Sequence, residues 1–265
     1  MLPARFSLHR PETINEALAL LAEYGDDATP YAGGTEILIA MKARVVRYRH
    51  VVDLKHIDSL RKVARREDGT IVIGALTTHH ELANNSLTRE YLPAYAELSE
   101  NIANIRVRVV GTLGGNLCFA EPHADPPTLL CALNASVVLV GISGERKIAV
   151  ADFMQGDFAT ARREGELLFR VEIPPLPVGA GVAYQSFGQL ERPAAGVAAV
   201  RLPGGTWRFW AGALVAKPTM FAEAPEEIEE RAGSIETHDD LHGSAEYKRH
   251  LVSVLARRAM KACLT

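Results

Sequence analysis

The residues best suited to bind a ligand lie in the segment 110–127, VGTLGGNLCFAEPHADPP. Three glycines, Gly111, Gly114 and Gly115, fall within five residues and are followed by Asn116. Because glycine has no side chain, this spacing is expected to leave backbone N–H groups open to an approaching anion. The segment is therefore the first candidate for a binding site.

A second glycine-rich segment lies upstream at 30–42, PYAGGTEILIAMK, where Gly33 and Gly34 precede an apolar run that contains one acidic residue, Glu36. We expect a short strand to enter the glycines and a short helix over 37–42 to follow them, an arrangement that suits a phosphate. Two such loops predict one ligand held from two sides. Two ordinary tight turns are the alternative interpretation.

Other motifs exclude several kinds of site. The chain has no GxGxxG at a strand-to-helix turn, no GxxxxGK[ST] and no GxSxG, which disfavours a dinucleotide fold, a P-loop and a serine hydrolase. His123 and Asp125 have no third ligand nearby, so Asp125 is better suited to accept a hydrogen bond from a polar ligand. His79 and His80 are adjacent and are predicted to lie on a solvated helix face, since two metal ligands on one helix need i, i+4 spacing.

Composition narrows the class of protein. The 265 residues are 48% hydrophobic and 23% charged, and the net charge of -3 with a pI near 6.3 argues against nucleic-acid binding. Cys118, Cys131 and Cys263 are too few and too widely spaced for a disulfide framework, a zinc site or an iron–sulfur cluster on this chain. No apolar run could span a bilayer and no signal-peptide pattern is present, so we predict a cytoplasmic protein.

The hydrophobic periodicity predicts an α+β fold with a small α/β lobe, a second lobe with a mixed or antiparallel sheet, and a C-terminal antiparallel sheet with helices. Possible capping boxes at Thr13 and Thr78 mark two helix starts, and the Pro/Gly-rich stretch after residue 173 marks a boundary. The expected helices span 14–24, 37–42, 78–85, 92–105, 126–134, 223–231 and 244–263. The expected strands span 29–32, 47–54, 135–141, 147–150, 166–173, 183–189, 195–202 and 206–216, with a hairpin within 57–75. The expected domains are an N-terminal lobe at 1–55, a central lobe at 56–174 and a C-terminal domain at 175–265.

Three segments carry a family resemblance. AGGTEILIAMK at 32–42, IGALTTHHEL at 73–82 and VGTLGGNLCFAEPHADPP at 110–127 resemble, in order and spacing, the signature segments of the flavoprotein subunit of molybdenum hydroxylases. This family includes the medium subunit of carbon monoxide dehydrogenase and the flavin domain of xanthine dehydrogenase. DLHGSAEYKRHL at 240–251 resembles the start of the family's C-terminal helix, so the resemblance extends over nearly the whole chain.

The resemblance implies FAD bound between the N-terminal and central lobes, with its pyrophosphate against the backbone of both glycine loops. It further implies that Asp125 contacts the ribityl chain or flavin ring, that Leu168 packs near the isoalloxazine and that Ile102 approaches the adenine. No side chain is expected to act as a catalytic acid or base. The implied FAD-binding residues are Ala32, Gly33, Gly34, Thr35, Glu36, Ile102, Gly111, Thr112, Gly114, Gly115, Asn116, Asp125 and Leu168.

The resemblance also implies partners. A small subunit would hold [2Fe-2S] clusters and a large subunit a molybdenum–pterin cofactor, in a dimer of heterotrimers. Electrons would pass through FAD to an external acceptor, and the hydroxylated substrate could be carbon monoxide, an aldehyde, a purine or another N-heterocycle. Two departures from the family are Gly188-Gln189, where many relatives carry Lys or Arg, and Phe119, which replaces a more polar residue.

Two other functions stay open at this stage. A stand-alone flavin-dependent oxidoreductase could share the same fold, although the chain after residue 174 is short for a substrate domain. A scaffold that has lost its flavin is disfavoured by the intact glycine pairs and Asp125.

Overall fold

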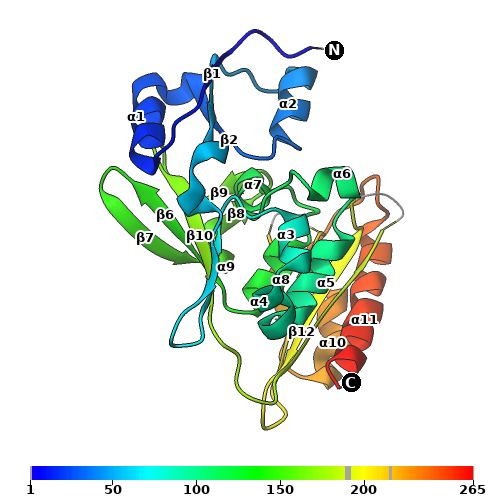
Figure 1. Cartoon of the computed structure of the whole chain (residues 1–265). Coiled ribbons are helices and arrows are strands. Elements are labelled where there is room, and N and C mark those ends of the chain that lie inside the picture. The colour runs from blue at the N-terminus through cyan, green and yellow to red at the C-terminus, as the bar shows by residue number, and fades with distance from the viewer. Residues whose placement is uncertain (1, 189–191, 215–216, 265) are drawn as a thin grey trace.

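The computed structural model describes residues 2–188, 192–214 and 217–264. Within them the chain forms three main sheets and one two-stranded hairpin, in an α+β arrangement (Figure 1). In the view of Figure 1 the N-terminal sheet lies at the top, the central sheet at the left and the C-terminal sheet at the lower right. Short 3-10 helices, η1 Gly25–Asp27, η2 Leu54–His56, η3 Asp58–Leu60 and η4 Pro225–Glu227, join larger elements.

The N-terminal sheet is parallel and has the strand order β1-β3-β2. Thr13 caps the first helix by accepting from the Glu16 N–H, but the Glu16 carboxylate returns to the N–H of Glu12 instead of closing a capping box. The sequence analysis did not predict strand β1. The strand has only three residues, too few to show a periodic pattern, and its partner strand lies some forty residues later in the chain. The elements are β1 Ser7–His9, α1 Ile14–Tyr24, β2 Ala28–Tyr31, α2 Ile37–Ala43 and β3 His50–Asp53.

The central sheet is antiparallel throughout, with the order β4-β5-β10-β6-β7. Its strands are β4 Val63–Arg65, β5 Ile71–Gly74, β6 Ser136–Gly141, β7 Gly144–Ala149 and β10 Leu167–Ile173, and β8 Met154–Gly156 pairs with β9 Ala159–Thr160. The capping box predicted at Thr78 and Glu81 is confirmed.

Helices connect the strands of this central part. The single helix predicted over 92–105 is wrong in extent: it ends at Asn101, the backbone turns at Ala103 with φ 41, and Asn104 caps a separate short helix. The helices are α3 His79–Asn84, α4 Ser86–Tyr91, α5 Pro93–Asn101, α6 Ile105–Arg108, α7 Leu113–Phe119, α8 Pro126–Ala132 and α9 Val150–Phe153.

The C-terminal sheet is the predicted antiparallel meander with one further strand, in the order β11-β12-β13-β14. Strand β14 has four residues and carries too short a pattern to be recognised from sequence. Residues 189, 215 and 216 of the predicted strands lie outside the described residues. The elements are β11 Gly181–Phe187, β12 Ala195–Arg201, β13 Trp207–Gly212, β14 Thr219–Ala222, α10 Ile228–Gly233 and α11 Ala245–Ala262.

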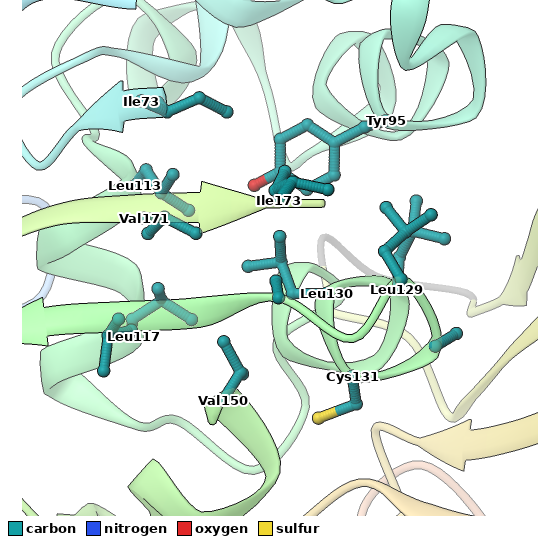
Figure 2. Close-up of a cluster of buried hydrophobic side chains, with 14 of the residues drawn as sticks. Ile73, Tyr95, Leu113, Leu117, Leu129, Leu130, Cys131, Val150, Val171 and Ile173 are labelled. Atoms are coloured by element: carbon teal, nitrogen blue, oxygen red, sulfur yellow. The ribbon is translucent and has the colours of Figure 1, made fainter. Parts of the chain in front are cut away.

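The largest hydrophobic core lies around α5, α7 and α8, between the central sheet and β12. Figure 2 shows Tyr95 of α5 above Leu129 and Leu130 of α8, with Leu113 and Leu117 of α7 beside Val171 of the central sheet. The start of α7, which carries two of the candidate glycines, is thus anchored in the core.

Strand β12 is covered on both faces. Ala198 and Val200 belong to the core around α8, whereas Val197 and Ala199 pack in a second core with α10 and α11. Helix α11 contributes Leu251, Leu255 and Ala259 to this second core, whereas Tyr247 at its start is 40% exposed and Ala262 at its end is also exposed. Among the described residues, the structure contains no helix of the length and apolarity needed to cross a bilayer.

Candidate functional site

The two glycine loops lie against each other. A Cβ placed on Gly33 would overlap the backbone of Val110, and a Cβ on Gly111 would lie 3.6 Å from Cγ2 of Thr35. Such close approach of two backbones requires glycine. The structure therefore brings together the loops 32–36 and 110–112, which the sequence predicts to hold one ligand.

The first loop presents open backbone donors. In the described part of the chain, no acceptor is found for the N–H groups of Gly33, Gly34, Thr35 and Glu36. Gly34 has φ +74 and lies against the Tyr31 ring, where a side chain would be strained and would overlap the ring. Successive open N–H groups at such a turn form a concave surface for an anion.

The second loop does not have the open donors that its glycines suggest. Gly111 N–H donates to the Val107 carbonyl at 2.6 Å, and Gly114 N–H donates to the Ala75 carbonyl at 2.8 Å. The other bonds are Leu113 N–H to the Thr77 carbonyl, Gly115 N–H to Thr112 Oγ1 and Asn116 N–H to the Thr112 carbonyl. The expectation of open donors over 111–116 is wrong for these five groups. The segment before α3 supplies the carbonyls for Leu113 and Gly114, from 36 to 39 residues upstream, and the local chain supplies the acceptors for the other three. Of this loop, only Thr112 N–H has no acceptor among the described residues.

Gly114 and Gly115 are explained by packing. A Cβ on Gly114 would lie 2.7 Å from the Ala75 Cβ and 2.8 Å from the Ala75 carbonyl oxygen, so the glycine lets α7 approach the end of β5. A Cβ on Gly115 would meet only Thr112 Oγ1, at 2.9 Å. Beside them, Asn116 Oδ1 is buried and has no partner among the described residues. That oxygen is available to a ligand that donates a hydrogen bond.

His79 is buried beneath the second loop, which contradicts the expectation of a solvated helix face. Its backbone N–H donates to the Gly111 carbonyl at 3.0 Å, and its side chain is 3% exposed. Burial, with a smaller effect from the nearby Arg108 charge, lowers the pKa of His79 to about 4. The neighbouring His80 is exposed, as predicted. Adjacent helix positions point in different directions, and the sequence does not tell which one faces the loop.

Arg192, which the sequence analysis did not single out, connects the two sides of the site. Its Nη2 lies 3.0 Å from Glu36 Oε2 and 3.2 Å from Glu36 Oε1, and its Nη1 lies 3.0 Å from Glu121 Oε1. Glu36 belongs to the first loop and Glu121 follows α7, so one guanidinium bridges both. The three residues are far apart in sequence, and no local signal could have joined them.

Asp125 is held by the C-terminal sheet. Its Oδ1 accepts a 2.6 Å hydrogen bond from the Tyr184 hydroxyl on β11, and Ser186 donates to the same carboxylate. Burial raises the pKa of Asp125 to about 6 against the lowering effect of these two bonds. Glycines make room for this contact, since a Cβ on Gly196 would overlap the Tyr184 hydroxyl.

His123 is not a partner of Asp125. Its Nδ1 lies 3.0 Å from the carbonyls of Pro193 and Ala213, to which it donates, because carbonyls only accept. Its Nε2 lies 3.3 Å from Oδ2 of Asp240, which also forms an ion pair with the fully buried Lys248. Among the described residues there is no group of three side chains that could hold a metal ion.

Ile102 and Leu168 lie in the core. Ile102 follows α5, and its carbonyl accepts from Arg108 Nη1 at 2.8 Å, so this arginine completes the helix end instead of facing a ligand freely. Leu168 is on β10 opposite Leu139, beside an irregularity in the strand. Both side chains are mostly buried in the cluster around α5, α7 and α8.

The two departures from the family have local causes. A Cβ on Gly188 would lie 2.7 Å from the Arg192 carbonyl oxygen and 2.8 Å from Pro193 Cα, so the loop has no room for the longer side chain. Gln189 lies outside the described residues. Phe119 packs edge-on against Phe158, with ring centroids 5.4 Å apart, which explains an apolar residue there.

Comparisons with known proteins bear on the family of this chain. A family model described as "FAD binding domain in molybdopterin dehydrogenase" matches residues 4–176. The carbon monoxide dehydrogenase medium chain of Afipia carboxidovorans is 35% identical over 98% of this chain and 97% of its own length. The xanthine dehydrogenase FAD-binding subunit of Escherichia coli O157:H7 is 34% identical over 64% of this chain and 58% of its own length.

Solved structures give the same relationship. A chain of carbon monoxide dehydrogenase from Hydrogenophaga pseudoflava, in a structure that lacks the Mo-pyranopterin moiety, matches with a TM-score of 0.93 and 31% identity. The match covers 100% of this chain and 99% of that one. With a family model over more than half of its residues and full-length relatives above 30% identity, this chain belongs to the FAD-binding flavoprotein subunits of the molybdenum hydroxylases.

Proposed function

We propose that this chain is the electron-transfer subunit of a multi-subunit molybdenum hydroxylase. In this proposal a small partner subunit with [2Fe-2S] clusters delivers electrons to the FAD of this chain, and an external acceptor removes them. A large partner subunit with a molybdenum–pterin cofactor carries out the hydroxylation. The observation that carries the proposal is the likeness to a medium chain over 98% of this sequence and 97% of that one.

The residues present fit FAD. The open N–H groups of Gly33, Gly34, Thr35 and Glu36 can donate to the pyrophosphate oxygens, and the N–H of Thr112 is the remaining open donor of the second loop. When bound, FAD supplies the capacity to accept and release one or two electrons. The contribution of this chain is to hold and orient the cofactor, and no side chain needs to transfer a proton.

The other candidate residues have supporting roles in this proposal. Ala32, Gly111, Gly114 and Gly115 shape the walls of the site, and the buried Asn116 Oδ1 accepts from a ligand hydroxyl. A carboxylate accepts up to about four hydrogen bonds, so Asp125 can bind a ribityl hydroxyl beside Tyr184 and Ser186. Leu168 and Ile102 supply apolar contacts to the flavin ring and the adenine from the edge of the core.

The proposal extends to the assembly. We assign residues 1–55 and 56–174 to the two lobes of the FAD-binding domain and residues 175–265 to the C-terminal domain, in a dimer of heterotrimers. We also propose a cytoplasmic location, which the free state of Cys118, Cys131 and Cys263 supports.

Purification of the chain from its own cells tests this function. The expected result is a heteromeric complex that contains iron and molybdenum, with FAD released by acid from this chain and identified by mass. A single chain that turns over substrate without iron or molybdenum would favour a stand-alone flavin oxidoreductase. A colourless chain that takes up no added FAD would contradict both functions.

Gly33→Ala tests the position of the pyrophosphate. The added Cβ overlaps the Val110 backbone and separates the two loops, so we expect FAD affinity to fall by about tenfold or more, equal to about 1.4 kcal/mol. Gly233→Ala is the matched control, since a Cβ there meets nothing within 4 Å. Equal FAD affinity in the two variants would remove the first loop from the site.

A further inference from the structure

The two loops proposed to hold the pyrophosphate, 32–36 and 110–112, are called the cradle here. The cradle contains a negatively charged side chain, which would repel an anionic ligand. Glu36 supplies one of the four open N–H groups, so its backbone lies where the pyrophosphate is proposed to bind. Its carboxylate is about one-third exposed, with 34% of the side chain accessible. A pyrophosphate is itself strongly anionic, and like charges at close range repel. An uncompensated Glu36 would therefore weaken the site.

Arg192 compensates this carboxylate. Its Nη2 contacts both oxygens of Glu36, at 3.0 and 3.2 Å, and its Nη1 contacts Glu121 at 3.0 Å. The contact with both oxygens of one carboxylate gives the ion pair a defined geometry. Among the described residues, the ion pair that Glu36 forms is with Arg192, which also pairs with Glu121.

The backbone beside Arg192 is fixed independently of these ion pairs. His123 Nδ1 donates to the Pro193 carbonyl at 3.0 Å, and Ala194 N–H donates to the Phe187 carbonyl at 2.7 Å. The Glu121 side chain is in turn held, because its Oε2 accepts from the His123 N–H at 2.9 Å. The Arg192 guanidinium thus contacts Glu36 from a segment whose backbone is itself held by hydrogen bonds.

We propose that Arg192 is the charge-balancing residue of the FAD cradle. By pairing with Glu36 it removes the repulsion that this carboxylate would exert on the pyrophosphate, and it does so from a domain that supplies none of the glycine donors. Arg192 is a positioning residue: its charge offsets that of Glu36, and the proposal gives it no contact with the ligand. The inference rests on the proposed function, because it assumes that the pyrophosphate lies at loop 32–36.

A double-mutant cycle tests the inference. The full chain, in the assembly in which it is purified, is stripped of flavin and titrated with FAD by fluorescence quenching at about 50 mM salt. Four proteins are compared: wild type, Arg192→Gln, Glu36→Gln and the double variant. We expect Arg192→Gln to raise the Kd for FAD about fivefold and Glu36→Gln to lower it, because each changes the local charge by one. The double variant should return to within about twofold of wild type.

Four controls separate charge from structure. Arg192→Lys keeps the positive charge and should bind FAD close to wild type, and the effect of Arg192→Gln should shrink at about 1 M salt, where charges are screened. Arg257→Gln removes an exposed ion pair with Glu229 on the far helices and should leave the Kd unchanged. Thermal unfolding of each flavin-free variant checks that the fold is retained.

The outcomes distinguish the inference from the function on which it rests. An Arg192→Gln variant that binds FAD as wild type does, or a double variant as weak as Arg192→Gln, would overturn the charge-balancing role. A tighter Kd for Arg192→Gln would overturn it as well. If the wild-type chain takes up no FAD, or if Gly33→Ala leaves its affinity unchanged, the proposed cradle itself is wrong.

Discussion

The Tyr184 hydroxyl donates a 2.6 Å hydrogen bond to the carboxylate of Asp125, and so joins β11 of the C-terminal sheet to the residue that precedes α8. Glu121 and His123 of the same segment also have polar partners in the C-terminal domain, Arg192 and Asp240 among them. Every polar side chain of the EPHAD segment at 121–125 therefore contacts that domain. The segment that follows the second glycine loop therefore ties the central part of the chain to the C-terminal sheet and the residues around it.

Replacing Tyr184 by Phe tests this connection. The change removes the donor and leaves the Asp125 carboxylate with one fewer partner, so we expect the free energy of unfolding in urea to fall by about 1–3 kcal/mol. Tyr247→Phe, at an exposed position on α11, is the control and should change it little. Equal effects in the two variants would show that the Asp125 bond does not stabilise the fold.

Asp125 should make stability fall as the pH rises. Its pKa is raised to about 6 in the folded chain, so the folded state holds a proton that the unfolded state releases near pH 4. This contribution is complete below pH 4 and is lost as the pH rises through about 6. The free energy of unfolding of Asp125→Asn minus that of wild type should therefore be about 2 kcal/mol higher at pH 7 than at pH 4. A constant difference between the two proteins over this range would contradict the raised pKa.

His79 should act in the opposite direction. Its pKa is lowered to about 4 by burial, whereas in the unfolded chain it titrates near 6.5, so stability falls as the pH drops between these values. Between pH 7 and pH 5, the free energy of unfolding of His79→Gln should fall by about 2 kcal/mol less than that of wild type. His80→Gln, one residue away and exposed, should leave the loss unchanged. Parallel pH profiles for the two variants would show that His79 is not held neutral.

The two glycines at the start of α7 should differ in their tolerance of a methyl group. Gly114→Ala forces a Cβ against Ala75 and should cost about 1–3 kcal/mol of unfolding free energy. Gly115→Ala brings a Cβ to 2.9 Å from Thr112 Oγ1, the cap of α7, and should cost less than Gly114→Ala, because a threonine side chain can shift more easily than the Ala75 backbone. Urea unfolding of both variants measures the difference. A larger loss for Gly115→Ala would contradict the packing role of Gly114.

Local signals predicted much of the secondary structure. Thr78 and Glu81 form the capping box that their spacing indicates, and the meander from β11 to β13 follows from alternation interrupted by the Gly204-Gly205 turn. The family resemblance, carried by three ordered segments, is confirmed by the family model and the full-length relatives. These features depend on residues close together in sequence.

Long-range features could not be predicted in this way. The donors of Gly111–Asn116 are satisfied partly by carbonyls of Ala75 and Thr77, and nothing in a glycine spacing reveals such acceptors. Arg192 meets Glu36 across 156 residues, and the burial of His79 depends on the loop that covers it. The assignment of the FAD-binding residues stays a prediction until the flavin titrations are made.

The two walls of the cradle differ in how their amide groups are bonded, and this has a consequence for ligand capture. The amides of Leu113 and Gly114 are tied to the chain around β5, so the second wall exists before any ligand arrives. The amides of Gly33, Gly34, Thr35 and Glu36 have no acceptor among the described residues. In deuterated solvent these amides are expected to exchange fast without ligand and slowly with it, while those of Leu113 and Gly114 are slow in both states.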